Sequence, residues 1–319
     1  MNWAAFSGKI HQLYRRVARL SWSTAMVGPE GEGFSHAVRP AARSQMGREQ
    51  LQFFPRLARI EDHPTAWRFP SYLDASQPWV AMLRDLYASP LAFPASLSPE
   101  MGLFLHGLVR NVRPRTVVEV GTFLGASTIW MASALAEAES DPPQSPLAVG
   151  QRRGVIHCFD DFGPITAGPW RTAELTDRPR IEVVRKHLVR ARVADRVVLH
   201  QGDSSVHIAR LAAELRSGLQ AGLSAGDAER PAANRGVDLA FIDGDHTVAG
   251  VLKDFGAVEP ILNTGGYVVL HDIYPDQCGE DGPRYLLDTL HSTTAGWYEA
   301  CEVYTSPLNY GMAVLRRVA

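Results

Sequence analysis

One stretch near the middle of the chain, Thr116–Ala132, constrains the fold more than any other part of the sequence. Its valine-rich run at 117–120 has no helical spacing and predicts a strand buried on both faces. Gly121 ends this run, and Gly125 stands four residues later, just before apolar residues that recur at helical spacing. Because glycine accepts positive φ and a helix start offers free amides, this strand, turn and helix predict a cradle for a nucleotide-like ligand.

The spacing within this stretch narrows the kind of ligand. The dinucleotide pyrophosphate motif needs an early glycine pair, whereas here an acid, Glu119, stands beside the single glycine Gly121. An acid in that place suits a ligand that carries an amino group and no phosphate, such as S-adenosylmethionine. The segment 119–128 resembles the class I S-adenosylmethionine-dependent methyltransferases, most closely their catechol O-methyltransferase-like branch. An ordinary strand-to-helix turn is the alternative. The resemblance implies that the donor is bound by Glu119, Gly121, Thr122, Gly125 and Ser127.

Two further strands are predicted at 155–159 and 197–200, and polar residues follow each of them. Asp160 follows the first, at the point where a doubly wound fold binds ribose hydroxyls, so it is a candidate ribose ligand. Its alternative role is a helix or turn cap. Asp203 and Ser204 follow the second strand, and the resemblance implies that they contact the donor, with the acid near the adenine edge. Asp203 is equally suited to cap the helix that begins near Ser204, and the two roles can coexist.

A second group of polar residues lies near the ends of two later strands, predicted at 237–243 and 267–270. The segment between them carries a helical apolar pattern, and strand, helix, strand in this order predicts two parallel strands. If the strands are neighbours, their carboxyl ends lie about 5 Å apart, which brings Asp243 and Asp272 together. Two carboxylates in one cleft repel each other unless a proton or a cation lies between them.

This group of residues resembles the divalent-metal site of the bacterial sugar and macrolide O-methyltransferases. The resemblance implies that Asp243, His271 and Asp272 bind the metal, Mg²⁺ or Mn²⁺. It also implies that Asp243 contacts the donor and that His246 is the base, so the predicted catalytic residues are Asp243, His246 and Asp272. In the alternative, Asp243 contacts only the donor, Asp272 is a cap or a general base, and His246 only orders the loop. His271 departs from those enzymes, which have an acid there. A histidine weakens a magnesium site, selects a softer ion such as Mn²⁺ or Fe²⁺, or points elsewhere.

The predicted fold is α/β: a doubly wound, Rossmann-like methyltransferase sheet with a parallel core and an antiparallel C-terminal strand pair. That pair is predicted at 301–304 and 312–315. We expect two regions, a helical and irregular N-terminal extension at 1–95 and a methyltransferase domain at 96–319. An amphipathic helix predicted at 10–20 suits packing on this domain or on a second subunit, so a homo-oligomer is expected. Binding to a membrane surface is the alternative for this helix.

Composition excludes several classes of partner. A formal net charge of −2 gives no electrostatic reason to bind nucleic acid or an anionic membrane. No apolar run approaches the length of a membrane span. The 3 cysteines stand far apart and form no Cys-x-x-Cys pair, which favours a reducing compartment and a cytoplasmic location.

The sequence therefore predicts an S-adenosylmethionine-dependent O-methyltransferase. Its acceptor is expected to be a hydroxyl of a small molecule, such as a sugar, a macrolide or another natural product, with assistance from a divalent metal and with His246 as base. One alternative is a cephalosporin-hydroxylase-like enzyme on the same fold. Another is a protein that binds S-adenosylmethionine without catalysis. A nicotinamide-dependent dehydrogenase fits the glycine spacing least well.

Overall fold

The computed structural model describes the fold from Trp67 onward, with internal gaps. The described residues are 67–89, 91–93, 95–140, 153–164, 179–217, 236–275, 281–293, 296–303 and 310–319. The amphipathic helix predicted at 10–20 lies outside them. None of the helices in the described part of the chain is long and apolar enough to cross a membrane.

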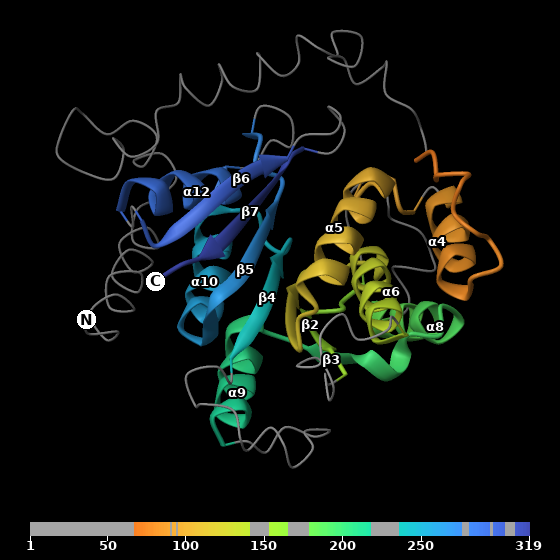
Figure 1. Ribbon diagram of the computed structural model, residues 1–319, viewed down its shortest axis with the longest axis horizontal. Helices are drawn as coiled ribbons and strands as arrows, with labels where there is room; N and C mark the ends of the chain where they lie inside the picture. Colours follow the sequence, from red (N-terminus) through yellow and green to blue (C-terminus); the bar gives the residue numbers. More distant parts are fainter. Residues whose placement is uncertain are drawn as a thin grey trace, which may run out of the picture. The chain divides into compact units, whose positions relative to one another are not determined.

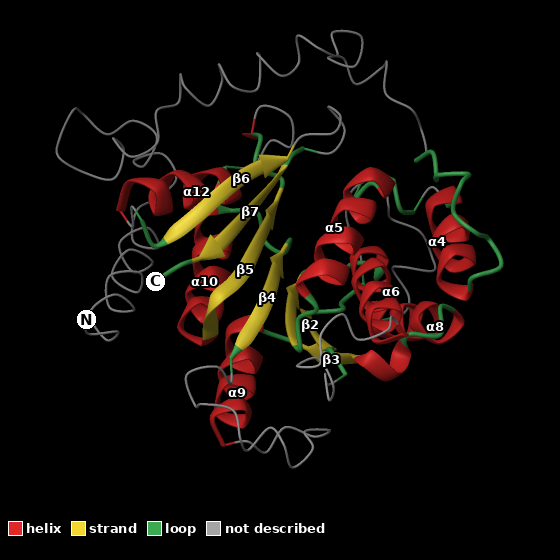
Figure 2. Ribbon diagram, in the orientation of Figure 1, coloured by secondary structure: helices red, strands yellow, loops and turns green. Residues whose placement is uncertain are grey.

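The strands form an α/β sheet whose core is parallel, as predicted. They are β1 (Thr116–Val120), β2 (Val155–Asp160), β3 (Val197–Gln201), β4 (Val237–Ile242), β5 (Leu262–His271), β6 (Tyr298–Val303) and β7 (Met312–Arg317). Within the described residues their order is β3-β2-β1-β4-β5-β7-β6 (Figure 2). β1 pairs with β2, β2 with β3 and β4 with β5, all in parallel. β7 runs antiparallel to both β5 and β6, which confirms the antiparallel C-terminal ending.

The chain divides into two compact units, one spanning His63–His207 and the other containing Ile208–Ala319 (Figure 1). Besides β1 to β3, the first unit contains α4 (Pro78–Ala88), α5 (Pro99–Val112), α6 (Ala126–Ser140), α8 (Arg180–Arg190) and the 3-10 turn η5 (Ala194–Arg196). Besides β4 to β7, the second contains α10 (Val248–Val258), the 3-10 turn η8 (Glu259–Ile261) and α12 (Gly282–Thr293). Helix α9 (Ser204–Ser217) begins in the first unit and ends in the second.

The core of the first unit is built around the buried indole of Trp130 on α6. Its Nε1 donates to the hydroxyl of Tyr87 on α4, and that hydroxyl donates to the carbonyl oxygen of Leu97. Gly102 on α5 leaves room for the ring, since a Cβ there would lie 2.1 Å from the indole nitrogen. Helix α4, which falls within the predicted extension, therefore packs into the same unit as β1. The boundary predicted between residues 95 and 96 stays a prediction.

Two helices begin at the side-chain caps that their sequences favour. The hydroxyl of Ser98 accepts the amide of Met101 at the start of α5. The hydroxyl of Thr247 accepts the amide of Gly250 at the start of α10, the helix that packs on β4 and α12. Such caps satisfy donors that a helix start leaves unpaired. The Thr247 cap ends the loop after β4, which fixes where that loop returns to helix.

Strand β5 begins earlier than the sequence predicts. Val237 pairs with Leu262, but Leu239 pairs with Tyr267, so β5 carries extra residues in a bulge. The side chain of Asn263 fills the bulge, where it accepts the amide of Gly236 and donates to a carboxylate oxygen of Asp238. Gly265, within the bulge, has a φ of 83°, a left-handed conformation that favours glycine.

Candidate donor and metal sites

The turn after β1 takes the conformation that its glycines predict. Gly121 has a φ of 87° and Gly125 a φ of 85°, both in the left-handed region that favours glycine. Phe123, between them, also has a positive φ, of 48°. A Cβ at Gly125 would lie 3.3 Å from a methyl group of Val184 on α8, so this glycine also permits a close approach. The turn leads directly into α6, and strand, glycine turn and helix are confirmed.

Four backbone amides of this turn, which precedes the helix start, donate to partners within the protein. The amide of Gly121 donates to the carbonyl oxygen of Phe159, and that of Gly125 donates to the carbonyl oxygen of Thr122. The amides of Thr122 and Phe123 both donate to a carboxylate oxygen of Asp160, at 2.9 and 3.0 Å. Hydrogen bonds within the protein therefore fix the conformation of this turn.

Glu119 lies beneath the turn, with its carboxylate wholly buried at 0% exposure. Its oxygens accept hydroxyl hydrogen bonds from Ser127 at 2.6 Å, from Thr128 at 2.5 Å and from Thr122 at 3.3 Å. Burial raises the pKa of Glu119, and these hydroxyls oppose that rise without cancelling it. Glu119 and Ser127 thus bind each other and brace the turn, and their direct contact with the donor stays a prediction. Thr128 is a member of this network that the sequence reasoning missed, although it stands next to Ser127.

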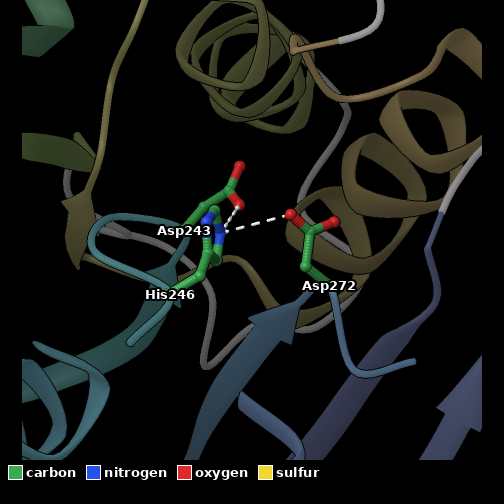
Figure 3. Close-up of side chains that lie close together, drawn as sticks. All are labelled: Asp243, His246 and Asp272. Atoms are coloured by element: carbon green, nitrogen blue, oxygen red, sulfur yellow. Dashed lines mark hydrogen bonds and ion pairs between the residues drawn. The ribbon is translucent and has the colours of Figure 1, made fainter. Parts of the chain in front are cut away.

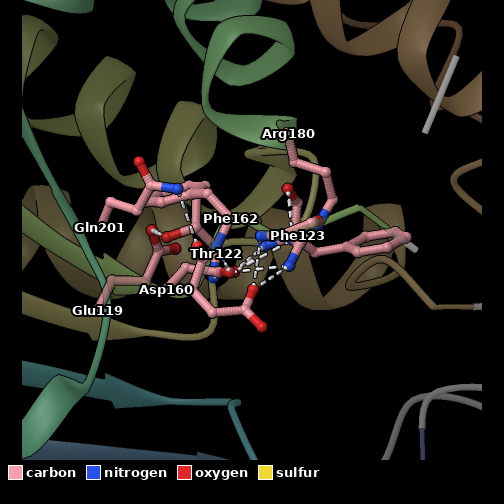
Figure 4. Close-up of polar contacts among 9 residues, drawn as sticks. Glu119, Thr122, Phe123, Asp160, Phe162, Arg180 and Gln201 are labelled. Carbon is pink, nitrogen blue, oxygen red and sulfur yellow. Dashed lines mark hydrogen bonds and ion pairs between the residues drawn. The ribbon is translucent and has the colours of Figure 1, made fainter. Parts of the chain in front are cut away.

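Asp160, at the end of β2, binds the turn from the other side (Figure 4). Besides the amides of Thr122 and Phe123, its carboxylate accepts the amide of Phe162 at 2.7 Å and two guanidinium nitrogens of Arg180 at 2.8 and 3.2 Å. Burial alone would raise the pKa of Asp160, but the charge of Arg180 and the amide bonds outweigh it and lower the pKa. These contacts are those of a turn cap, the alternative that the sequence left open, and they occupy both oxygens.

Arg180 was not predicted as a site residue. Its guanidinium is only 10% exposed and also donates to the carbonyl oxygens of Phe123 and Gly163. It lies over the ring of Phe123, with the guanidinium carbon 5.9 Å from the ring centre. No spacing or motif in the sequence links it to Asp160, because an irregular, proline-rich stretch separates the two residues.

Asp203 caps α9, as one of its two predicted roles requires. One of its carboxylate oxygens accepts the amides of Ser205 at 2.9 Å and Val206 at 3.3 Å, as well as the hydroxyl of Ser205. Ser204 is buried at the first position of the helix. Contact of Asp203 and Ser204 with the donor stays a prediction.

In the second unit, the carboxyl ends of β4 and β5 bring together the predicted cluster. Asp243 follows β4 directly, His271 is the last residue of β5, and Asp272 follows it. The two strands pair in parallel with Ile242 opposite Leu270, which places their ends side by side, as the sequence predicted. Figure 3 shows His246 on the loop after β4, with its ring joined to both carboxylates.

Four side chains meet within ion-pair distance. The Nε2 of His246 lies 3.1 Å from an oxygen of Asp243 and 3.3 Å from one of Asp272. The Nδ1 of His271 lies 3.1 Å from the same Asp243 oxygen and 2.8 Å from the other oxygen of Asp272. Each imidazole therefore bridges the two carboxylates, and His271 points into the cluster.

The backbone of Asp272 explains how two adjacent residues face one point. Successive side chains of a strand point to opposite faces, so His271 and Asp272 can converge only where the strand ends. Asp272 has a φ of 58°, a left-handed conformation that aspartate adopts more readily than most non-glycine residues do. Its amide donates to the carbonyl oxygen of Gly311 at 3.0 Å, just before β7. A residue next to β7 thus holds the backbone of the residue that completes the cluster.

The charged groups of the cluster shift one another's pKa. Burial would raise the pKa of Asp243, but the positive charge of His271 and hydrogen bonds from both imidazoles hold that pKa at about 2. Burial would lower the pKa of His246, yet its bond to Asp243 and the charges of both carboxylates raise it. The pKa of His271 is raised further, because the charges of Asp272 and Asp243 outweigh its deeper burial. The carboxylate pair is therefore compensated by positive charge, as its closeness requires.

The same side chains offer a set of metal ligands. One ligand atom each of Asp243, His246 and Asp272 lies within 4.8 Å of the others, and His271 touches both carboxylates. The set differs from the predicted one, because it includes His246, which was assigned as the base. Two carboxylates with imidazole nitrogen fit a divalent ion, and nitrogen donors favour Mn²⁺ and its transition-metal neighbours over Mg²⁺.

Comparison with known proteins agrees with this fold. Residues 118–273 match the sequence model of a family described as a methyltransferase domain, a range that includes every predicted site residue. Together with the strand order, this match identifies a methyltransferase domain of the class I, S-adenosylmethionine-dependent type.

Solved structures with the same fold share little sequence with this chain. A candidate O-methyltransferase from Klebsiella pneumoniae is 19% identical with a TM-score of 0.51, and the alignment covers 78% of this chain and 93% of that one. An O-methyltransferase from Bacillus cereus, in complex with S-adenosylhomocysteine, is 16% identical with a TM-score of 0.51 and the same coverage of both chains. Identities this low show the fold alone. No curated protein matches the chain.

Proposed function

We propose that the chain is an O-methyltransferase that transfers the methyl group of S-adenosylmethionine to a hydroxyl of a small molecule. A sugar, a macrolide or another natural product is the proposed class of acceptor. The observation that carries this proposal is the cluster of Asp243, His246, His271 and Asp272 at the ends of β4 and β5. A methyltransferase domain supplies the fold, and this cluster supplies groups that can bind a hydroxyl and accept its proton.

The proposed reaction is an in-line displacement. The acceptor oxygen forms a bond to the methyl carbon while the bond from that carbon to the sulfonium breaks, which leaves S-adenosylhomocysteine. Because a sulfonium is a good leaving group, the protein has to align the reactants and remove the hydroxyl proton. The Nε2 of His246, in the neutral form of its ring, is the proposed acceptor of that proton, and the carboxylate of Asp243, 3.1 Å away, then stabilises the imidazolium.

A divalent ion fits the same cluster. Held by Asp243 and Asp272, it would supply a positive charge that lowers the pKa of the acceptor hydroxyl. Mn²⁺ suits the imidazole nitrogens better than Mg²⁺ does. For the donor we propose the turn Gly121–Gly125, with Glu119 and Ser127 bracing it and with Asp203 and Ser204 at the end of β3.

The test combines donor binding with turnover. Calorimetry measures whether S-adenosylmethionine and its product bind, and a panel of hydroxylated small molecules is then screened for stoichiometric release of S-adenosylhomocysteine. For an acceptor that turns over, Asp243→Asn and His246→Gln are each expected to lower kcat about 100-fold or more, the range of a general acid or base. Titration with Mn²⁺ and Mg²⁺ measures the preferred ion directly.

Asp245→Asn is the matched control. This acid lies on the same loop, is exposed, and accepts only the amide of Thr247 among the bonds found there, which an asparagine can replace. It should keep nearly full turnover. Full turnover in both Asp243→Asn and His246→Gln would contradict the assigned chemistry. Tight donor binding without product on any acceptor would favour a non-catalytic binding protein, and an oxygenase would consume no donor.

Three further proposals concern the whole chain. We propose that it forms a homo-oligomer, that it works in the cytoplasm, and that its catalytic domain spans 96–319 behind an extension at 1–95. The first and last are tested together by light scattering on the full chain and on a truncation that starts at residue 67, before α4.

A further inference from the structure

The carboxylate of Asp160 has no hydrogen-bond acceptor site left for a ligand. An ionised carboxylate has about four lone-pair sites. Asp160 accepts five hydrogen bonds from the protein, three from the backbone amides of Thr122, Phe123 and Phe162 and two from Arg180. Its side chain is only 8% exposed. A donor ribose would have to displace Arg180 or break the turn in order to reach this carboxylate.

The carboxylate of the next residue, Asp161, is accessible to a ligand. The side chain of Asp161 is 78% exposed, also at the carboxyl end of β2. One of its oxygens accepts the amide of Gly163 at 2.9 Å and a guanidinium nitrogen of Arg180 at 2.8 Å. No described residue donates a hydrogen bond to its other oxygen. The carboxylate is therefore open to solvent and still fixed in direction.

The backbone of Asp161 is also held. Its carbonyl oxygen accepts the side-chain amide of Gln201, the last residue of β3, at 3.2 Å. Phe162, which follows, has a φ of 50° and a wholly buried ring. Because this conformation is costly for a phenylalanine, the surrounding contacts must hold it in place. Arg180 connects Asp161 to the glycine turn, since the same guanidinium donates to the carbonyl oxygen of Phe123.

We propose that Asp161, and not Asp160, accepts the ribose hydroxyls of the methyl donor. Asp160 and Arg180 serve as positioning residues: they fix the conformation of the turn and the orientation of the Asp161 carboxylate. Ribose is the part of the donor with two adjacent hydroxyl donors, and an acid after the second strand of a doubly wound sheet is in place to accept them. This inference rests on the proposed function, because it requires that the donor binds at this turn.

The test measures preference for the ribose hydroxyls. Calorimetry on the full chain compares S-adenosylhomocysteine with its 2′,3′-dideoxy analogue. A hydrogen bond to a charged group predicts that the wild type binds the natural ligand about 10- to 100-fold more tightly. In Asp161→Ala this ratio should fall to about 1–3, and Asp161→Asn, which can keep the bond to Gly163, should also lower it. In Asp160→Asn both ligands should bind more weakly, with the ratio preserved.

The control is Glu182→Gln, which removes another exposed acid, 57% exposed and paired with Arg185 on α8. It should leave both affinities unchanged. A ratio that survives in a folded Asp161→Ala protein, or that is lost in Asp160→Asn alone, overturns the inference. Equal binding of both ligands to the wild type overturns it too, while the proposed function stands. No binding of S-adenosylhomocysteine at all overturns the proposed function itself.

Discussion

Removal of the Arg180 guanidinium is expected to loosen the turn that follows β1. The group binds the Asp160 carboxylate twice, at 2.8 and 3.2 Å, and both side chains are at most 10% exposed. Removing one partner of a buried ion pair costs about 3–5 kcal/mol. In Arg180→Ala three backbone amides still bind Asp160, so we expect the lower end of this range, about 3 kcal/mol. That loss corresponds to a fall in Tm of about 6–12 °C, at about 2–4 °C for each kcal/mol in a domain of this size.

Urea unfolding followed by circular dichroism measures the loss, and hydrogen exchange locates it. The amides of Thr122 and Phe123 are protected by Asp160 in the wild type and should exchange faster in Arg180→Ala. The matched control is Arg185→Ala on the same helix, whose partner is an exposed acid and whose loss should cost about 0.5 kcal/mol or less. The reasoning is refuted if the two variants differ by less than about 1 kcal/mol, or if the turn amides stay protected.

Two further predictions concern the core of the first unit. Burial, reinforced by the charge of His200 nearby, lowers the pKa of His157 to about 4, so the folded state favours the neutral ring. The unfolded chain takes up its proton near pH 6.5, so stability should fall by about 3 kcal/mol as the pH drops from about 6.5 to about 4. Urea unfolding at several pH values should show part of this fall disappear in His157→Gln, and an unchanged fall would contradict the assignment. Gly102→Ala places a methyl group 2.1 Å from the indole nitrogen of Trp130 and should cost about 1–3 kcal/mol. Gly107→Ala on the same helix meets nothing within 4 Å and should stabilise by about 0.5–1 kcal/mol, so equal stabilities of the two variants in urea would refute the packing argument.

Much of the sheet could be predicted because its strands carry their own signal. β1 and β4 are valine- and isoleucine-containing runs buried along most of their length, and such runs suit the interior of a parallel sheet. The insertion of β7 between β5 and β6 was not predicted. Its residues are compatible with either an edge or an inner place, and which strand it pairs with depends on the assembled sheet.

In the candidate site, too, some features could be predicted from the sequence and others could not. The meeting of Asp243 and Asp272 could be predicted, because parallel strands end at the same edge. The left-handed backbone of Asp272 could not, because it depends on a hydrogen bond to Gly311 from a distant part of the chain. The commitment of Asp160 to the turn escaped prediction for a similar reason, since its partner Arg180 follows a stretch without periodicity.

The bond between Asp272 and Gly311 also bears on the order in which the protein is made. Every residue of the cluster is synthesised before Gly311, yet the conformation of Asp272 relies on that glycine and on β7 behind it. β5 remains an open edge until β7 pairs with it. A nascent chain that already contains all four cluster residues therefore still lacks the finished cluster, which forms only when the last strand in the described part of the chain is in place.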